Sequence, residues 1–213
     1  MLVLGIDSTS DAATASLVRD GVVLCEYTQN HKKTHSVKML PMVEGMLSDL
    51  DVELRDIDVF ACGIGPGSFT GVRIGVATVK GLAFPKGLPC APVSTLESLA
   101  ENLSGTEGIV CALMDARRNQ FYYALFENGV RLTPDSCGGI EEICALLGEK
   151  KATLCGDGAA VFASLFPDRC PHTVANPVIR EQNALSTALC GYRMYMEGKT
   201  VSGKELRPTY IRV

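Results

Sequence analysis

An internal repeat is the feature that most constrains the fold of this chain. Leu4-Gly-Ile-Asp7 is followed by Gly21, fourteen residues after its aspartate. Ala112-Leu-Met-Asp115 is followed by Gly129 at the same spacing. Each match reads as a strand that ends in aspartate, then a second strand and a glycine turn. The repeat therefore predicts two related α/β units of about a hundred residues each.

A second match supports the duplication. Cys62-Gly-Ile-Gly65 has an echo in Cys155-Gly-Asp-Gly158, and each glycine pair lies between a predicted strand and a predicted helix. We therefore predict an α/β fold with an N-terminal domain over residues 1–104 and a smaller C-terminal domain over residues 105–213. The predicted helix over residues 183–197 is expected to return to the first domain or to bridge the two.

The composition narrows the class of protein. Hydrophobic residues make up 46% of the 213 residues, enough for a core, and no apolar run approaches the length of a membrane span. The net charge of −4 argues against a protein that grips nucleic acid by itself. Nine scattered cysteines without a C-x-x-C pair are typical of buried thiols in a reducing cytoplasm, and the start of the chain lacks the pattern of a secretory signal. We expect a cytoplasmic protein that does not enter a membrane.

A glycine-rich stretch, GIGPGSFTGVRIG over residues 63–75, follows an apolar run. It lacks the Gly-Lys-Ser/Thr ending of a Walker loop, and Ser68 replaces the last glycine of a dinucleotide fingerprint. Backbone amides at a helix start could still hold an anion. The alternative, which we favour from the spacing, is a tight turn that lets the helix pack close to its sheet.

Two tandem units that each open with such a hairpin resemble the actin-like ATPase (ASKHA) superfamily. Its members stack two ribonuclease H-like domains and bind ATP in the cleft between them. The resemblance makes Asp7 and Ser8 remnant candidates for a phosphate-contacting turn, and Gly156 and Gly158 remnant candidates for an adenosine-contacting turn. The chain departs from the superfamily at residues 115–119, where the second acidic turn has two arginines and no glycine.

The stretch GPGSFTGVRIG, followed by VSTLESLA, resembles the TsaB (YeaZ) family, and the resemblance runs from GIDSTSDAATASL to the closing RPTYIR. The family is needed for N6-threonylcarbamoyladenosine at position 37 of tRNAs that read ANN codons. TsaB is a paralogue of TsaD, the catalytic subunit, which holds a metal with two histidines of an N-H-x-x-x-H motif. Thr95 and Leu99 stand at those places here, and neither can replace imidazole as a ligand. The resemblance implies no catalytic residue, no metal and no cofactor in this chain.

One histidine pair could suggest a metal site. His31 and His35 have the i, i+4 spacing that would place both on one face of a helix. However, Thr34 or Ser36 is a good N-cap for the helix that follows, which would leave His31 outside it. We favour two surface histidines beside a helix start over a metal pair.

Two predicted helices carry more apolar surface than one sheet can cover. The helix over residues 70–84 is apolar nearly all round, and the helix over residues 38–50 is rich in methionine. Either they cover each other within the domain, or together they form a patch that binds a partner, or both. We predict a partner interface in which Gly71 and Gly75 set the distance of approach, with these residues: Met39, Met42, Val43, Met46, Gly71, Val72, Gly75, Val76 and Val79.

Three functions remain open. The first is a scaffold, not an enzyme by itself, that pairs with a TsaD-like catalytic subunit and a TsaE-like P-loop ATPase, and meets tRNA only through that complex. In isolation the same patch could form a homodimer. The second is an ATP-binding phosphotransferase of the actin-like superfamily, and the third is a glycoprotease-type metallopeptidase, although H-E-x-x-H is absent. Loss of the motifs at Thr95 and Leu99 favours the first.

Overall fold

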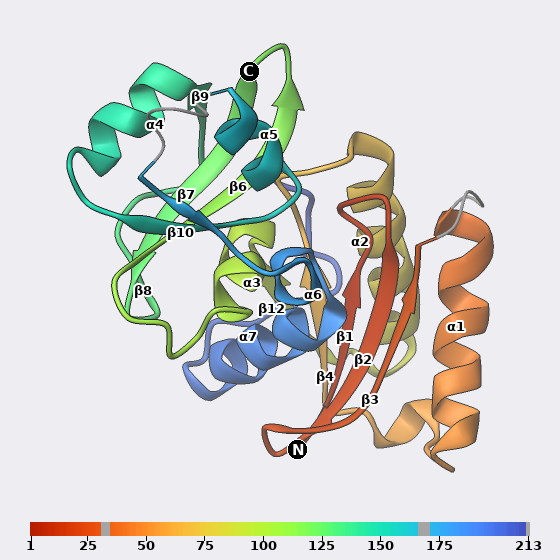
Figure 1. Cartoon of the computed structure of the whole chain (residues 1–213). Helices are drawn as coiled ribbons and strands as arrows, with labels where there is room; N and C mark the ends of the chain where they lie inside the picture. Colours follow the sequence, from red (N-terminus) through yellow and green to blue (C-terminus); the bar gives the residue numbers. More distant parts are fainter. Residues whose placement is uncertain (31–34, 166–170, 212–213) are drawn as a thin grey trace. The chain divides into compact units, whose positions relative to one another are not determined.

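The computed structural model describes residues 1–30, 35–165 and 171–211. The chain forms two compact units (Figure 1). The first contains Met1–Thr95 and Gln182–Thr209, and the second contains Leu96–Glu181 and the end of the chain from Tyr210. Each unit has its own sheet, its own helices and its own hydrophobic clusters.

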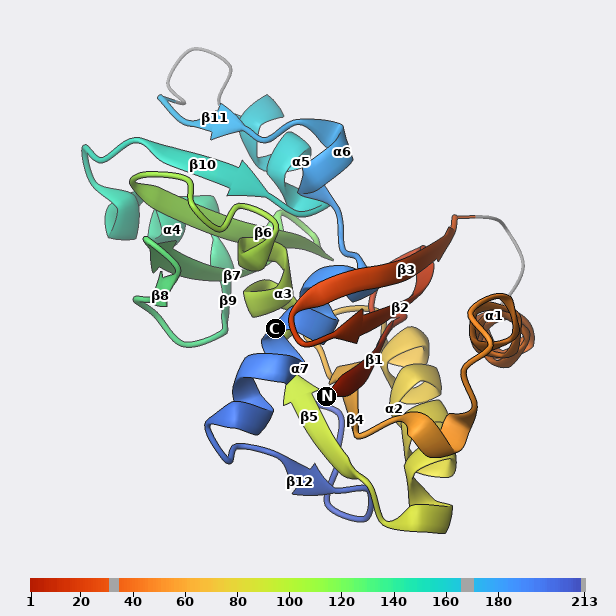
Figure 2. The same cartoon turned by 90° about the horizontal axis from the view of Figure 1, so that it is seen from below.

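The first unit is built on a six-stranded sheet in the order β12-β5-β4-β1-β2-β3 (Figure 2). Its strands are β1 (Leu2–Asp7), β2 (Ala13–Arg19), β3 (Val22–Gln29), β4 (Val59–Gly63), β5 (Pro89–Val93) and β12 (Val201–Ser202). The first three strands are antiparallel neighbours, whereas β4 runs parallel to β1 and β5 parallel to β4. Asp20 and Gly21, both at positive φ (51° and 80°), form the tight hairpin between β2 and β3.

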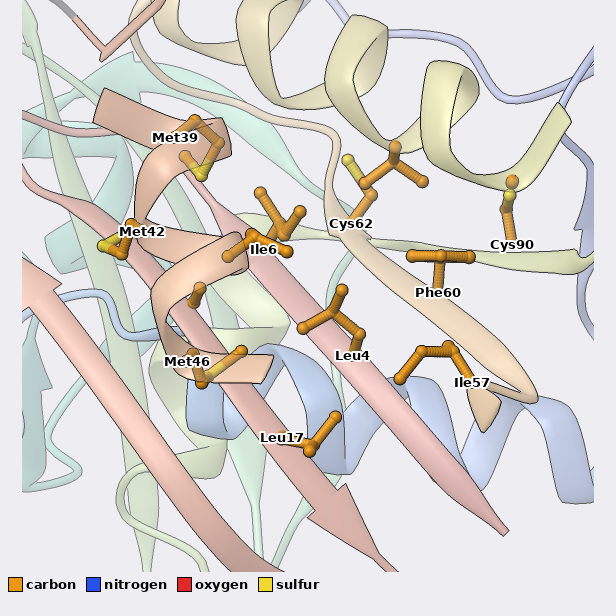
Figure 3. Packing of buried hydrophobic residues seen from close by; sticks show 14 of the residues in the cluster. Leu4, Ile6, Leu17, Met39, Met42, Met46, Ile57, Phe60, Cys62 and Cys90 are labelled. Atoms are coloured by element: carbon orange, nitrogen blue, oxygen red, sulfur yellow. The ribbon is translucent and has the colours of Figure 1, made fainter. Parts of the chain in front are cut away.

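Helices cover both faces of this sheet. They are α1 (His35–Asp49), α2 (Phe69–Ala83) and α7 (Ala184–Met196), with short 3-10 turns η1 (Leu54–Asp56) and η2 (Phe84–Lys86). One cluster joins α1 and α2 to the sheet through residues such as Met39, Met46 and Phe60 (Figure 3). A second cluster joins α7 to the opposite face. Because both faces are covered, every residue of β1 is buried.

The second unit repeats the plan with a sheet in the order β11-β10-β6-β7-β8, to which β9 adds beside β7. Its strands are β6 (Ile109–Arg117), β7 (Gln120–Glu127), β8 (Val130–Arg131), β9 (Ser136–Gly139), β10 (Ala152–Cys155) and β11 (Thr173–Val174). Its helices are α3 (Thr95–Glu101), α4 (Ile140–Leu147), α5 (Gly158–Ser164) and α6 (Pro177–Arg180). One cluster packs α4 and α5 on the sheet, and another packs α3 on the opposite face.

Strand pairing confirms the α/β fold and its duplication. In both units the first strand pairs antiparallel with the second and parallel with the strand that ends in the glycine motif, and that strand pairs parallel with the next. Thus β1, β2, β4 and β5 correspond to β6, β7, β10 and β11.

Each copy gives its final helix to the other copy's sheet. Helix α3 follows β5 but packs in the second unit, and α7 follows the strands of the second unit but packs in the first. The predicted return of the helix over residues 183–197 is therefore confirmed. Each compact unit therefore contains segments from both halves of the sequence. The predicted domain boundary between residues 104 and 105 divides the two sequence repeats, and it stays a prediction.

A buried aromatic pair tests the core of the second unit. Phe162 of α5 is fully buried and lies edge-on to Phe121 of β7, with ring centroids 5.4 Å apart. Phe162→Ala should lower the free energy of unfolding by about 3–5 kcal/mol, because it removes the ring and leaves a cavity. Calorimetry can measure this, with Val178→Ala, at a highly exposed valine of the same unit, as the control. A loss as small as that of the control would show that the cluster does not hold this unit together.

Candidate functional site: the Asp7 turn and the glycine loop

The turn after β1 places a carboxylate inside the first unit. Asp7 is 1% exposed, and its Oδ1 accepts hydrogen bonds from the backbone amide and the hydroxyl of Thr9, at 2.8 and 2.7 Å. Its Oδ2 accepts a hydrogen bond from the Thr187 hydroxyl of α7 at 3.3 Å. Burial raises the pKa of the Asp7 carboxyl above its usual value, and the hydrogen bonds oppose that rise. Both oxygens are thus engaged within the unit.

The neighbouring hydroxyl is engaged as well. Ser8 is buried, and its Oγ donates a hydrogen bond to the carbonyl of Gly71 in the first turn of α2, at 2.8 Å. Because the two remnant candidates of the phosphate turn bond to their own unit, they hold the turn in place. A direct role of either residue in ligand binding stays a prediction.

The glycine loop, residues 63–68 between β4 and α2, packs directly on this turn. A Cβ atom at Gly63 would overlap the Asp7 carboxylate, and one at Gly67 would overlap the carbonyl of Thr9. The Ser68 amide also donates to that Thr9 carbonyl at 2.7 Å. The structure therefore supports the packing interpretation of the glycine-rich stretch.

Helix α2 begins against the same turn. Ser68 is its N-cap, with its hydroxyl oxygen accepting from the Gly71 amide at 3.2 Å. A Cβ atom at Gly71 would overlap the Ser8 carbonyl, and one at Gly75 would lie 2.6 Å from the Ser8 Oγ. The missing side chains thus bring α2 close to Ser8 of its own unit, whereas the sequence had suggested that they admit a partner helix.

In the second unit, Gly156 and Gly158 pack on the end of the first strand, β6. Gly156, at φ +94°, has no room for a Cβ atom beside the carbonyl of Leu113, and a Cβ atom at Gly158 would lie 3.0 Å from the Asp115 amide. Between them, Asp157 Oδ1 accepts a hydrogen bond from that amide at 3.2 Å. These contacts give both glycines a packing role at the end of β6, and their predicted contact with adenosine stays a prediction.

The turn between β6 and β7 has an unusual backbone for its residues. Arg117, Arg118 and Asn119 have φ values of 71°, 55° and 59°, in the left-handed region that favours glycine. The Asp115 carboxylate accepts from the Arg117 amide at 2.7 Å and pairs with its guanidinium at 3.2 Å. All three turn residues are exposed, so the turn is charged and solvated.

The two positions that the resemblance aligns with the histidines of TsaD lie on α3. Thr95 and Leu99 are fully buried, and the Thr95 hydroxyl has no hydrogen-bond partner among the described residues. Within residues 1–30, 35–165 and 171–211, no group of three or more His, Cys, Asp or Glu side chains could hold a metal ion. His31 lies outside the described residues, and His35 Nε2 is 2.8 Å from the Ser10 carbonyl oxygen.

The nine residues predicted for a partner interface lie inside the first unit. All are buried, and the methionines and valines among them belong to the cluster between α1, α2 and the sheet (Figure 3). The side chains that face outward from the two helices are others, notably Val37 and Leu40 on α1 and Phe69 and Arg73 on α2. Contact of the buried set with a partner stays a prediction. Any partner at this surface meets the outer residues first.

Paired glycine substitutions on α2 test the packing on Ser8. Gly71→Ala should destabilise the protein by about 1–3 kcal/mol because its methyl group overlaps the Ser8 carbonyl. Gly81→Ala, on the same helix with nothing within 4 Å, should stabilise it by about 0.5–1 kcal/mol through helix propensity. Chemical denaturation of both variants measures the difference. Equal effects would mean that α2 does not depend on the Ser8 contact.

Asp157 gives a test by pH. Burial raises the pKa of its carboxyl from 3.8 to about 6. A folded-state pKa above the unfolded value favours folding at low pH, and this contribution is lost as pH rises from about 4 through about 6. Asp157→Asn should therefore gain stability over the parent at pH 7.5 and not at pH 4. Melting temperatures at the two values decide, with Glu149→Gln, exposed in the same unit, as the control.

Among the described residues, no helix combines the length and the apolar character needed to cross a bilayer.

Residues 22–163 match the family model described as "TsaD: tRNA N6-adenosine threonylcarbamoyltransferase". The fold resembles that of a polyphosphate/ATP-glucomannokinase from an Arthrobacter strain, with a TM-score of 0.56 at 11% identity over 92% of this chain and 99% of that one. This likeness concerns the fold alone, which is that of the actin-like ATPase superfamily.

Three proteins with higher identity to this chain are named TsaB or YeaZ. "tRNA threonylcarbamoyladenosine biosynthesis protein TsaB" of Bacillus subtilis is 37% identical over 154 residues, 70% of this chain and 67% of that protein. The protein of the same name from Escherichia coli is 32% identical over 224 residues, covering 100% of this chain and 95% of that one. The structure of YeaZ from Pseudomonas aeruginosa superposes with a TM-score of 0.84, at 25% identity over 99% of both chains. The chain belongs to the TsaB (YeaZ) family.

Proposed function

We propose that this chain is a non-catalytic subunit required for N6-threonylcarbamoyladenosine formation at position 37 of ANN-decoding tRNAs. It acts by pairing with a TsaD-like catalytic subunit. Family membership and the names of its relatives support the place in tRNA modification. The observation that carries the non-catalytic role is the buried pair Thr95 and Leu99, because neither side chain offers a nitrogen ligand at the positions of the catalytic histidines.

The pairing surface is the outer side of α1 and α2, here called the α1–α2 face and formed by Val37, Leu40, Phe69, Arg73 and Ala77. The two helices pack on each other and on the sheet, so their outer sides form one surface. Val37 is 63% and Phe69 57% exposed, and the Arg73 guanidinium lies 3.6 Å from the centre of the Phe69 ring. Large exposed apolar side chains beside a stacked arginine are typical of interface anchors.

The α1–α2 face also explains the expected homodimer, and two further associations belong to the same proposal. A two-fold homodimer would pair the α1–α2 face with its own copy, and a paralogue of the same fold could replace one half. A TsaE-like P-loop ATPase completes the complex. With a net charge of −4, the chain contacts tRNA through its partners and does not bind it alone.

No observation favours the two alternative functions. A phosphotransferase of the actin-like superfamily would need Asp7 and Ser8 to face a nucleotide, whereas both bond within their own unit. A glycoprotease-type metallopeptidase would need a cluster of metal ligands. The described part of the chain contains no such group of three.

Introducing a negative charge at an exposed valine tests the pairing. Val37→Glu should weaken binding to the purified TsaD-family subunit of the same organism at least tenfold, because it buries an unpaired carboxylate in the interface. Reconstituted tRNA modification should fall with it, and should fail when this chain is omitted. Val130→Glu is the matched control, since Val130 is 66% exposed and lies in the second unit.

Two outcomes would contradict the proposal. Full modification without the chain would remove its required role, and normal binding by Val37→Glu would place the interface elsewhere. Val76→Arg, by contrast, should unfold the first unit, because Val76 lies in the core cluster. If Val76→Arg folds normally and loses only partner binding, the interface contains the residues predicted from the sequence.

A further inference from the structure

We propose that the last segment of the first unit, residues 203–209, is a clamp that sets the position of α2 and thereby shapes the α1–α2 face. This C-terminal clamp follows β12, which pairs antiparallel with β5 at the edge of the sheet. The proposal rests on the proposed function, because its effect on binding passes through the surface described there. Its structural part stands on contacts with the last turn of α2 and with the loop that leads into the helix.

At the end of α2, the clamp lies over the last turn. Lys80 Nζ donates hydrogen bonds to the backbone carbonyls of Leu206 and Lys204, at 3.2 and 3.4 Å. Leu206 is 1% exposed and belongs to the same cluster as α1 and α2. Gly203 lies near Ala83, since a Cβ atom there would be 3.7 Å from the Ala83 Cβ. One cation, one buried leucine and backbone contact therefore join the two segments.

At the start of α2, the clamp holds the glycine loop. The Thr209 amide donates to the carbonyl of Ile64 at 2.8 Å. Gly65, at φ +106°, faces the Thr209 carbonyl so closely that a Cβ atom would lie 2.7 Å from it. The other side of the loop rests on Thr9 through Gly67. The loop that leads into α2 is thus held between the Asp7 turn and the C-terminal clamp.

Helix α2 needs such support from outside. It contains three glycines, Gly71, Gly75 and Gly81, and each costs about 1 kcal/mol of helix stability relative to alanine. A helix of this composition takes its position from tertiary contacts more than from its own propensity. The clamp contacts the last turn of α2 and the loop before its first turn, from residues more than a hundred positions away in sequence.

The clamp affects partner binding indirectly, through the position of the outer side of α2. Phe69, Arg73 and Ala77 stand on the exposed side of the helix whose ends the clamp contacts. A shift or fraying of α2 would move these three side chains relative to α1. Because docking depends on the mutual placement of both helices, Lys80 acts as a positioning residue, without itself belonging to the proposed contact surface.

Three lysine variants test the clamp in the full-length chain. Lys80→Met keeps the apolar stem and removes the donor, whereas Lys80→Arg keeps a cation with donors. Lys86→Met is the matched control, because Lys86 Nζ also donates to a backbone carbonyl, that of Arg55, at 2.9 Å and away from the clamp. The measurements are hydrogen exchange over residues 64–80 and the Kd for the purified TsaD-family subunit of the same organism.

Lys80→Met should speed exchange over residues 64–80 and raise the Kd by about tenfold or more, the factor that corresponds to the loss of a hydrogen bond from a charged donor. Lys86→Met and Lys80→Arg should stay near the parent in both. The clamp is overturned if Lys80→Met matches Lys86→Met, if exchange rises while the Kd does not change, or if Lys80→Arg fails like methionine. Failure of the proposed function can be told apart from failure of the clamp. If the α1–α2 face is not the interface, Val37→Glu will bind normally, whatever hydrogen exchange shows for Lys80→Met.

Discussion

The buried carboxylate of Asp7 is the interaction on which the first unit depends. Its two oxygens collect hydrogen bonds from Thr9, in its own turn, and from Thr187, on the helix that returns 180 residues later. A buried acid without such donors would cost several kcal/mol. The hydrogen bond from Thr187 therefore joins α7 to the turn after the first strand. The glycine loop then closes over this turn, because Gly63 and Gly67 leave room for it.

The second unit solves the same packing problem with less burial of its acid. There, Asp157 lies between the two glycines of the strand end, and its carboxylate caps the amide of Asp115. Although the residue is partly exposed, its neighbours desolvate the Asp157 carboxyl, which raises its pKa to about 6. The duplicated plan therefore keeps close glycine packing at the end of the first strand in both units. In the second unit Asp115 keeps the place of Asp7, and Asp157 adds another acid in the loop after β10.

Local sequence patterns predicted the repeat, the strand ends and the two helices of the first unit, because these depend on short spacings. The orientation of the helices was harder to predict. Helix α2 is apolar nearly all round, so periodicity could not distinguish the side that meets Ser8 from the side that meets solvent. The sequence therefore named Val72, Val76 and Val79 for the interface, and these face the core. Thr187 and Thr209 were missed because no local signal links them to the Asp7 turn.

One chain of contacts connects the first residues to the last. The Asp7 turn supports the glycine loop, the loop leads into α2, and the residues after β12 contact both that loop and the last turn of the helix. A catalytic phosphate site needs side chains and amides that remain free for a ligand, whereas here they are used to support a helix. The acid and the glycines of the first unit thus hold α2 in place.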